Sequence, residues 1–285
     1  MGNLFEKLSD DGRIGLEALR GEPARAVLAF DFDGTLSPIV ADPEQAYAHP
    51  GVVPALSRLA PLVGAVVVVT GRPAATAVRL GGFAGVAGLE HLTVLGHYGL
   101  ERWDAATGEL SAPAEHPGVT ALRPELPGLL AAAGTPEGAW IEDKGHALAV
   151  HTRRTAAPDE ALALLDAPLR AAADRHGLAV EPGRMVLELR PPGMDKGVVL
   201  TAFLRERAAG SVLFAGDDLG DLTAYDAVDA LRASRGLPGL LVCSAPSTGE
   251  PPVRALAERA DLIVPGPEGV VELLGRLAGE LSSVD

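Results

Sequence analysis

Short apolar runs alternate with amphipathic stretches along two parts of this 285-residue chain, and this alternation limits the fold more than any other feature. In the first part, apolar runs at 27–30, 65–69 and 93–99 are separated by helix-like stretches at 51–60 and 73–80. Strands that alternate with helices in this way are typical of a parallel sheet covered on both faces. We therefore expect an α/β fold.

The same alternation returns after residue 195. The predicted elements of this part are a helix at 195–208, a strand at 211–216, a helix at 218–233, strands at 239–243 and 261–264, and a last helix that ends near residue 280. We expect the two parts to form one discontinuous sheet, with 1–111 and 191–285 as a single core domain.

The segment between these parts, 112–190, has a different sequence pattern. An Ala- and Pro-rich stretch is followed by strands in which polar and apolar residues alternate, at 139–144, 147–153 and 185–190, and by a helix at 159–176. Such alternation predicts an antiparallel sheet with one exposed face and helices on the other. We expect an inserted α+β cap domain.

Composition excludes several kinds of partner. With 38 acidic and 24 basic side chains the net charge is −14, so the chain lacks the basic surface that nucleic acid or an anionic membrane requires. Apolar runs such as 65–69 are far too short to span a bilayer. The single cysteine, Cys243, lies in an apolar run, and this context predicts that its thiol is inert and buried in the core. A cytoplasmic protein is the expectation, and the sequence leaves open whether it is a monomer.

Two acids, Asp31 and Asp33, directly follow the apolar run 27–30. Residues i and i+2 of a strand share a face, which places the two carboxylates about 6.6 Å apart along the chain. Like charges at this separation repel unless a cation lies between them. Gly34, the next residue, permits a sharp turn.

Further polar groups follow the neighbouring strands, at the edge where open parallel sheets bind ligands. Thr70 and Arg72 follow the second strand, and Asp217, Asp218 and Asp221 follow the strand at 211–216. A lone Asp after a strand is usually a helix cap or a turn residue, but five acids at one edge need a cation, and oxygen ligands favour Mg²⁺.

A positive charge of the protein itself is expected beside these acids. Lys196 begins the helix predicted at 195–208. A lysine in this position is suited to pair with a phosphate or with a nucleophilic carboxylate.

The four segments DFDGTLSP (31–38), TGR (70–72), Lys196 and GDDLGD (216–221) together resemble the ordered motifs of the haloacid dehalogenase superfamily of Mg²⁺-dependent phosphohydrolases. The resemblance implies a Rossmann-like core in which Asp31 is the nucleophile that accepts the phosphoryl group. It also implies that Asp33 is the general acid and base, with its backbone carbonyl on the metal.

The same resemblance implies roles for the remaining core residues. Thr70 and Lys196 would bind the phosphoryl oxygens. Asp217 would complete the set of Mg²⁺ ligands formed with Asp31 and Asp33. Asp218 and Asp221 would either be additional ligands or contact the groups that bind the ion. We expect Gly34 and Arg72 to lie against the substrate.

The cap strands carry a mixture of acids and bases on one face. Glu142 and Lys144 share a face, as do His151 and Arg153, whereas Glu188 lies opposite the leucines beside it. This pattern is also that of an ordinary solvated sheet face, but mixed charges suit the many hydroxyls of a sugar.

The segments LSPIV (36–40), GHYGLE (96–101), IEDKG (141–145), AVHTR (149–153) and MVLELRP (185–191) resemble those of the trehalose-6-phosphate phosphatase family. By this resemblance, Glu142, Lys144, Arg153 and Glu188 would bind the glucosyl units of trehalose 6-phosphate, a substrate of trehalose biosynthesis. His97 and Glu101 are carried over as further substrate-binding candidates.

Two other functions remain open. One is a phosphatase for another phosphorylated disaccharide or pseudo-disaccharide, which the same chemistry would serve with a different cap. The other is a phosphoryl-accepting switch or binding module without turnover, although such a protein would not need the proton-transfer group Asp33. A dinucleotide-binding site is excluded because the first strand is followed by DFDGT rather than by a glycine-rich turn.

Overall fold

The computed structural model describes residues 4–183, 185–193, 195–246 and 251–283. The chain divides into two compact units. The first comprises Met1–Ser111 and Asp195–Asp285, and the second comprises Ala112–Met194. The chain therefore leaves the first unit and returns to it, and each unit is described separately below.

A mostly parallel sheet forms the centre of the first unit. Within the described residues it has eight strands in the order β12-β11-β10-β1-β2-β3-β4-β5. Neighbours from β12 to β3 are parallel, and β3–β4 and β4–β5 are antiparallel. The strands are β1 (Ala26–Phe30), β2 (Ala65–Val69), β3 (Leu92–Gly96), β4 (Glu101–Asp104), β5 (Leu110–Ser111), β10 (Ser211–Gly216), β11 (Gly239–Ala245) and β12 (Leu262–Pro265). The predicted parallel sheet is confirmed, whereas β4 and β5 were not predicted.

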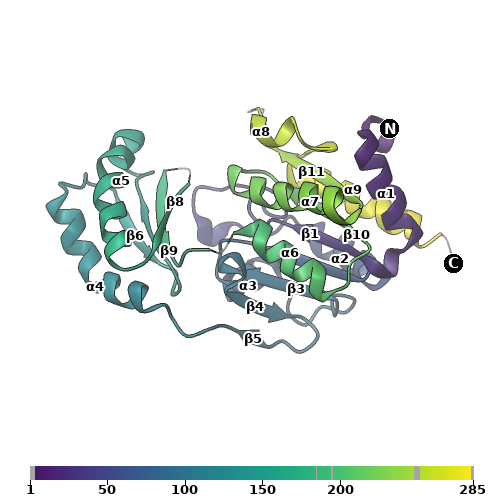
Figure 1. The fold of residues 1–285 in the computed structure, drawn as a ribbon, viewed down its shortest axis with the longest axis horizontal. Helices are drawn as coiled ribbons and strands as arrows, with labels where there is room; N and C mark the ends of the chain where they lie inside the picture. The colour runs from purple at the N-terminus through teal and green to yellow at the C-terminus, as the bar shows by residue number, and fades with distance from the viewer. Residues whose placement is uncertain (1–3, 184, 194, 247–250, 284–285) are drawn as a thin grey trace. The chain divides into compact units, whose positions relative to one another are not determined.

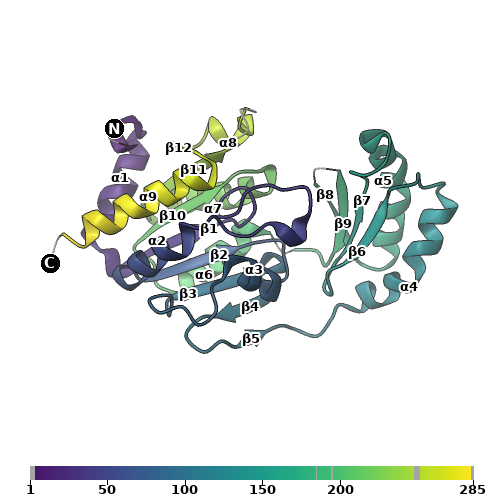
Figure 2. The ribbon, with the colours of Figure 1, turned by 180° about the vertical axis from the view of Figure 1, so that it is seen from behind.

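Helices cover both faces of this sheet. Figure 1 shows α6 (Lys196–Glu206) and α7 (Leu222–Arg235) in front of the strands, and Figure 2 shows α2 (Val52–Leu59), α3 (Ala74–Gly81) and α9 (Gly266–Leu281) on the opposite face. Every residue of β1, β2 and β3 is buried, which explains why these strands are continuously apolar. Across the described part of the chain, none of the helices combines the length and the apolar character that a membrane span needs.

Helix α1 (Asp10–Gly21), which precedes the first strand, packs against β10 and β11. Gly15 permits this approach, because a Cβ at this position would lie 1.8 Å from the carbonyl oxygen of Gly239. Asp261 links three elements: its carboxylate accepts hydrogen bonds from Ser9 Oγ, from the backbone N–H of Leu241 at 2.8 Å and from Arg232 Nη2 at 2.5 Å. The helix is therefore an integral part of the first unit.

The second unit is a four-stranded antiparallel sheet, in the order β6-β7-β9-β8, with two helices on one face. Leu148 and Val150 of β7 and Leu187 and Leu189 of β9 point toward the helices and form the core of this unit. The alternation predicted from the sequence is therefore confirmed. The elements are α4 (Pro117–Ala132), β6 (Trp140–Asp143), β7 (Leu148–His151), α5 (Pro158–Arg175), β8 (Ala179–Gly183) and β9 (Val186–Arg190).

Candidate active site

Three adjacent parallel strands bring the candidate residues to one edge of the main sheet. Asp31, Thr70 and Asp217 directly follow β1, β2 and β10, and Phe30 is paired with Ala215 at the end of the β1–β10 ladder. Asp31 and Thr70 are 4% and 1% exposed. The structure thus gathers these residues at the edge that the sequence indicated.

Lys196 lies between two of the acids. Its Nζ is 2.7 Å from Asp31 Oδ1 and 2.7 Å from Asp221 Oδ1, and all three side chains are buried. Burial opposes the lysine charge, but Asp221 and Asp31 outweigh it and raise the pKa of Lys196 well above its ordinary value. The ammonium group is therefore held in its charged form.

The fold fixes Lys196 through the start of α6. Asp195 caps this helix by accepting a hydrogen bond from the backbone N–H of Val198 at 2.8 Å. Gly197 allows the helix to approach α7 closely, because a Cβ there would lie 2.2 Å from the carbonyl oxygen of Thr223.

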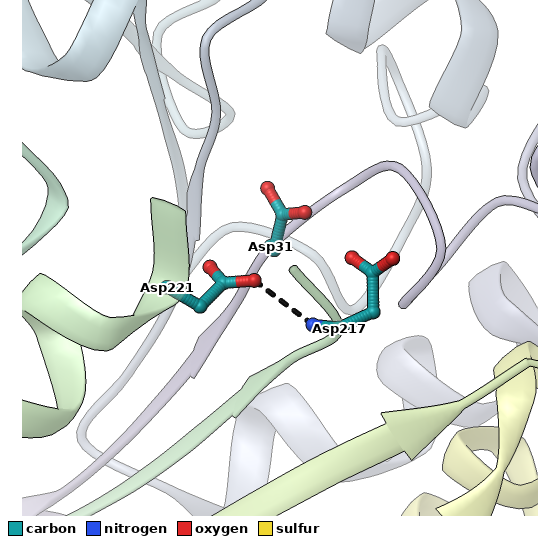
Figure 3. Close-up of side chains that lie close together, drawn as sticks. All are labelled: Asp31, Asp217 and Asp221. Carbon is teal, nitrogen blue, oxygen red and sulfur yellow. Dashed lines mark hydrogen bonds between the residues drawn. The ribbon is translucent and has the colours of Figure 1, made fainter. Parts of the chain in front are cut away.

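Asp31 and Asp221, the two partners of this lysine, form a group of three carboxylates with Asp217. Figure 3 shows the three side chains, each of which offers one oxygen atom, and these atoms lie within 4.8 Å of one another. Asp221 is held most firmly, since its Oδ2 accepts hydrogen bonds from the backbone N–H groups of Asp217 at 2.9 Å and Asp218 at 3.1 Å. Gly216 makes room for it, because a Cβ there would lie 2.3 Å from Asp221 Cγ.

The electrostatics of this group favour a bound cation. Burial, followed by repulsion from Asp31 and Asp221, raises the pKa of Asp217 to about 10. Burial raises the pKa of Asp31 well above its ordinary value as well, despite the opposing charge of Lys196. Asp217 Oδ1 is buried and has no hydrogen-bond partner among the described residues. Three carboxylate oxygens with one unsatisfied acceptor fit a hard divalent cation.

Two other predicted ligands have their carboxylates engaged elsewhere. Both oxygens of Asp33 accept hydrogen bonds from Arg72, at 2.6 Å from Nε and 2.7 Å from Nη2. Asp218 is exposed, and its carboxylate accepts a hydrogen bond at 2.9 Å from the backbone N–H of Gly220. The backbone carbonyl that the sequence assigned to Asp33 as a metal ligand stays a prediction, as does the ligand role of Asp218.

Gly34 is required by the backbone, as the sequence suggested. Its φ is +76°, and a Cβ there would lie 2.0 Å from Asp217 Oδ2. Ser244, at the end of β11, donates a hydrogen bond from Oγ to the Gly34 carbonyl at 2.7 Å. The sequence analysis missed Ser244, although its place at the carboxyl end of a parallel strand was the same signal that identified Asp31 and Asp217.

His97 and Glu101 support the loop that carries Thr70. The backbone N–H of His97 donates to the Arg72 carbonyl at 2.9 Å, and that of Tyr98 donates to the Thr70 carbonyl at 3.0 Å. Glu101 accepts a hydrogen bond at 2.6 Å from the backbone N–H of Ala74, at the start of α3. Both predicted residues are buried. The structure gives them contacts within the protein, and their binding of substrate stays a prediction.

Glu142, Lys144 and Glu188 of the second unit lie on the face of the sheet that the helices do not cover. Lys144 and Glu188 form an ion pair, and Glu142 lies 2.7 Å from His151 Nε2. Arg153 is exposed just beyond β7. Glu188 is 7% exposed, and its Oε1 has no hydrogen-bond partner among the described residues. A buried acceptor of this kind is suited to receive a hydrogen bond from a ligand hydroxyl.

Sequence comparisons identify relatives of known type. The model of the family described as Trehalose-phosphatase matches residues 29–255. A trehalose-phosphate phosphatase of Mycobacterium marinum is 33% identical over 268 residues, which cover 91% of this chain and 63% of that protein. The chain thus spans less than two thirds of the length of this curated relative.

Solved structures share the fold. The C-terminal domain of C. albicans trehalose-6-phosphate phosphatase matches with a TM-score of 0.69 at 20% identity, covering 98% of this chain and 99% of that domain. A haloacid dehalogenase-like hydrolase from Bacteroides thetaiotaomicron matches with a TM-score of 0.56 at 18% identity, covering 88% of this chain and 98% of that one. The predicted fold class, a haloacid dehalogenase-like α/β core with a separate antiparallel unit, is confirmed.

Proposed function

We propose, from the premise that the chain belongs to the trehalose-phosphatase family, that it hydrolyses trehalose 6-phosphate to trehalose and inorganic phosphate. The observation that carries this proposal is the buried Asp31 at the end of β1, with Lys196 Nζ at 2.7 Å and the carboxylates of Asp217 and Asp221 beside it. This arrangement supports a carboxylate nucleophile whose surroundings can hold a phosphoryl group.

The reaction would proceed in two displacements. In the first, an oxygen of Asp31 forms a bond to phosphorus while the bond from phosphorus to the sugar oxygen breaks, and Asp33 donates a proton to that oxygen. In the second, Asp33 takes a proton from water, the water oxygen bonds to phosphorus, and the bond to Asp31 breaks. A covalent intermediate divides one difficult step into two easier ones. Thr70 and Lys196 would hold the phosphoryl oxygens in both steps.

The cofactor proposed for this site is Mg²⁺. Asp31 and Asp217 would supply carboxylate oxygens and Asp33 its backbone carbonyl, with Asp218 and Asp221 as further candidates. Asp221 is the less direct of these, because both of its oxygens accept hydrogen bonds from Lys196 or the backbone. When bound, the ion would offset the repulsion among the carboxylates and the phosphoryl group.

The substrate preference is proposed to come from Glu142, Lys144, Arg153 and Glu188. Glu142, Lys144 and Glu188 offer hydrogen-bond acceptors and a donor on one sheet face, and Arg153, just beyond β7, would add further donors, which is what a disaccharide rich in hydroxyls requires. The unsatisfied Oε1 of the buried Glu188 supports its place in this set.

Phosphate release from a panel of esters tests the proposal. The panel contains trehalose 6-phosphate, sucrose 6-phosphate, glucose 6-phosphate and an aryl phosphate, each with Mg²⁺ and with chelator. We expect a strong, Mg²⁺-dependent preference for trehalose 6-phosphate. A preference for another sugar ester would overturn the substrate and keep the phosphatase chemistry, whereas no release from any ester would favour a binding module.

Replacing Glu188 should separate sugar recognition from chemistry. We expect Glu188→Ala to lower kcat/KM for trehalose 6-phosphate about 10- to 100-fold, because one charge-assisted hydrogen bond to the sugar is lost. The aryl phosphate, which has no sugar, should be hydrolysed almost as fast as by the wild type. Steady-state kinetics with both esters gives the comparison.

Glu181 provides a matched control for this variant. It is paired with Glu188 across the β8–β9 ladder but is engaged with Arg190 at 2.9 Å. Glu181→Ala should leave the preference unchanged. Equal losses on both esters in Glu188→Ala would contradict the assignment of this sheet face to sugar binding.

A further inference from the structure

Arg72 is bound to Asp33 through two separate hydrogen bonds. Its Nε lies 2.6 Å from Asp33 Oδ2 and its Nη2 lies 2.7 Å from Asp33 Oδ1, so the flat guanidinium and the flat carboxylate face each other edge to edge. A paired contact of this type fixes the orientation of the carboxylate as well as its position. A lysine, with a single charged nitrogen, cannot reproduce it.

The rest of the Arg72 guanidinium is also committed to the protein. Nη1 donates to the carbonyl oxygen of Pro43 at 3.0 Å, and the guanidinium carbon lies 5.8 Å from the ring centroid of Phe32. The Arg72 side chain is 15% exposed. The side chain is thus held by three different parts of the segment that follows β1.

The backbone of Arg72 is fixed as well. Its N–H donates to Thr70 Oγ1 at 3.1 Å, and its carbonyl accepts from the N–H of His97 at 2.9 Å. The loop after β2 is therefore tied to the loop after β3, and the side chain that leaves it has a defined starting point from which to reach Asp33.

We propose that Arg72 is a positioning residue that acts through Asp33, and not the substrate-binding group that the sequence suggested. This inference rests on the proposed function, in which Asp33 gives a proton to the sugar oxygen and later takes one from water. By holding both carboxylate oxygens, Arg72 sets the direction in which Asp33 faces the reacting groups. Losing Arg72 should matter most where the leaving oxygen needs that proton.

Leaving groups of different basicity distinguish this role from phosphate binding. A sugar oxygen is a poor leaving group without a proton, whereas an aryl oxygen leaves as the anion. We expect Arg72→Lys to lower kcat for trehalose 6-phosphate about 100-fold, which is the lower range of what general acid–base catalysis contributes, and to lower kcat for the aryl ester less than about tenfold. Arg72→Gln, which also lacks the guanidinium group and its two parallel hydrogen bonds, should behave in the same way.

Arg79→Ala is the matched control. Arg79 lies on α3 and forms an ion pair at 2.5 Å with Glu44, in the same segment that Arg72 contacts at Pro43. The Arg79→Ala substitution therefore removes an ion pair to this segment without changing any contact of Asp33. The kinetic constants of Arg79→Ala should equal those of the wild type. The melting temperature of each variant tests whether the fold is retained.

A double-mutant cycle gives the decisive outcome. If Arg72 acts through Asp33, then adding Arg72→Lys to Asp33→Asn should change kcat less than about threefold, because the group it positions is already lost. Multiplication of the two single effects would overturn the inference, as would a rise in KM of Arg72→Lys that is equal for both esters with kcat unchanged.

The wild type tests the proposed function, and the Arg72 variants test the inference, so the two failures can be told apart. A wrong substrate appears in the wild type as a preference for another sugar ester, and that ester then replaces trehalose 6-phosphate in the comparison. A wrong role for Arg72 appears only in its variants.

Discussion

Asp31→Asn is expected to abolish turnover, with a fall in kcat of at least about 10⁴-fold on every phosphate ester. The amide keeps the shape of the carboxylate but removes the charge that attacks phosphorus. Because Asp31 would react with all esters in the same way, the loss should not depend on the leaving group, unlike the loss expected for Arg72→Lys. Phosphate release under single-turnover conditions measures it.

The folded state should survive this substitution. Asp31 is buried beside Asp217 and Asp221, so removing its charge relieves repulsion, while Lys196 retains Asp221 as a partner at 2.7 Å. The melting temperature without Mg²⁺ should be equal to that of the wild type or higher. Substantial turnover by Asp31→Asn would contradict the nucleophile assignment, and mass spectrometry of wild-type protein quenched during turnover should find the added phosphoryl group on Asp31.

Removing divalent cations is expected to reduce turnover to the background rate, and adding Mg²⁺ should restore it. The physical reason is the group of Asp31, Asp217 and Asp221: burial, followed by repulsion from the other two acids, raises the pKa of Asp217 to about 10, so a cation is needed to hold all three carboxylates in their charged form. Binding should also stabilise the fold, by about 2.7 kcal/mol at a concentration 100 times the dissociation constant. The melting temperature therefore provides a measure that does not depend on activity.

Asp217→Asn tests which residues hold the ion. It should remove most of the Mg²⁺-induced rise in melting temperature and shift the Mg²⁺ dependence of the rate to much higher concentrations. Because the pKa of Asp217 is raised to about 10, cation binding must displace its proton, so the affinity for Mg²⁺ should increase as the pH rises toward that value. Full activity after exhaustive chelation would exclude the metal site.

The sequence predicted the central strands well because they are buried on both faces. Such strands must be apolar along their whole length, so β1 and β2 can be recognised in the sequence as continuous apolar runs. Helix α4 was missed because it contains Pro124 and Pro127, which normally interrupt a helix. In the structure both prolines are exposed to solvent, and Leu122, Leu126 and Leu130 form the buried stripe at a spacing of four.

The candidate site divides in a similar way. The meeting of Asp31, Thr70 and Asp217 follows from chain order, since adjacent parallel strands end at one edge. The pairing of Arg72 with Asp33 does not follow from the sequence, because it depends on how a side chain from one loop crosses to another. The sequence assigned Arg72 to the substrate, and Asp33 to proton transfer and the metal, whereas the structure joins their side chains to each other.

Helix α1 has a consequence for how the boundaries of this protein are drawn. The stretch shared with the family, residues 29–255, begins inside β1 and stops before β12 and α9. A fragment cut at these limits would retain every proposed catalytic and sugar-binding residue, yet it would expose the apolar surfaces of β11 and α2 that α1 and α9 cover. The region that identifies the family is thus smaller than the region that must fold together. A deletion far from the proposed chemistry can inactivate the protein by unfolding it.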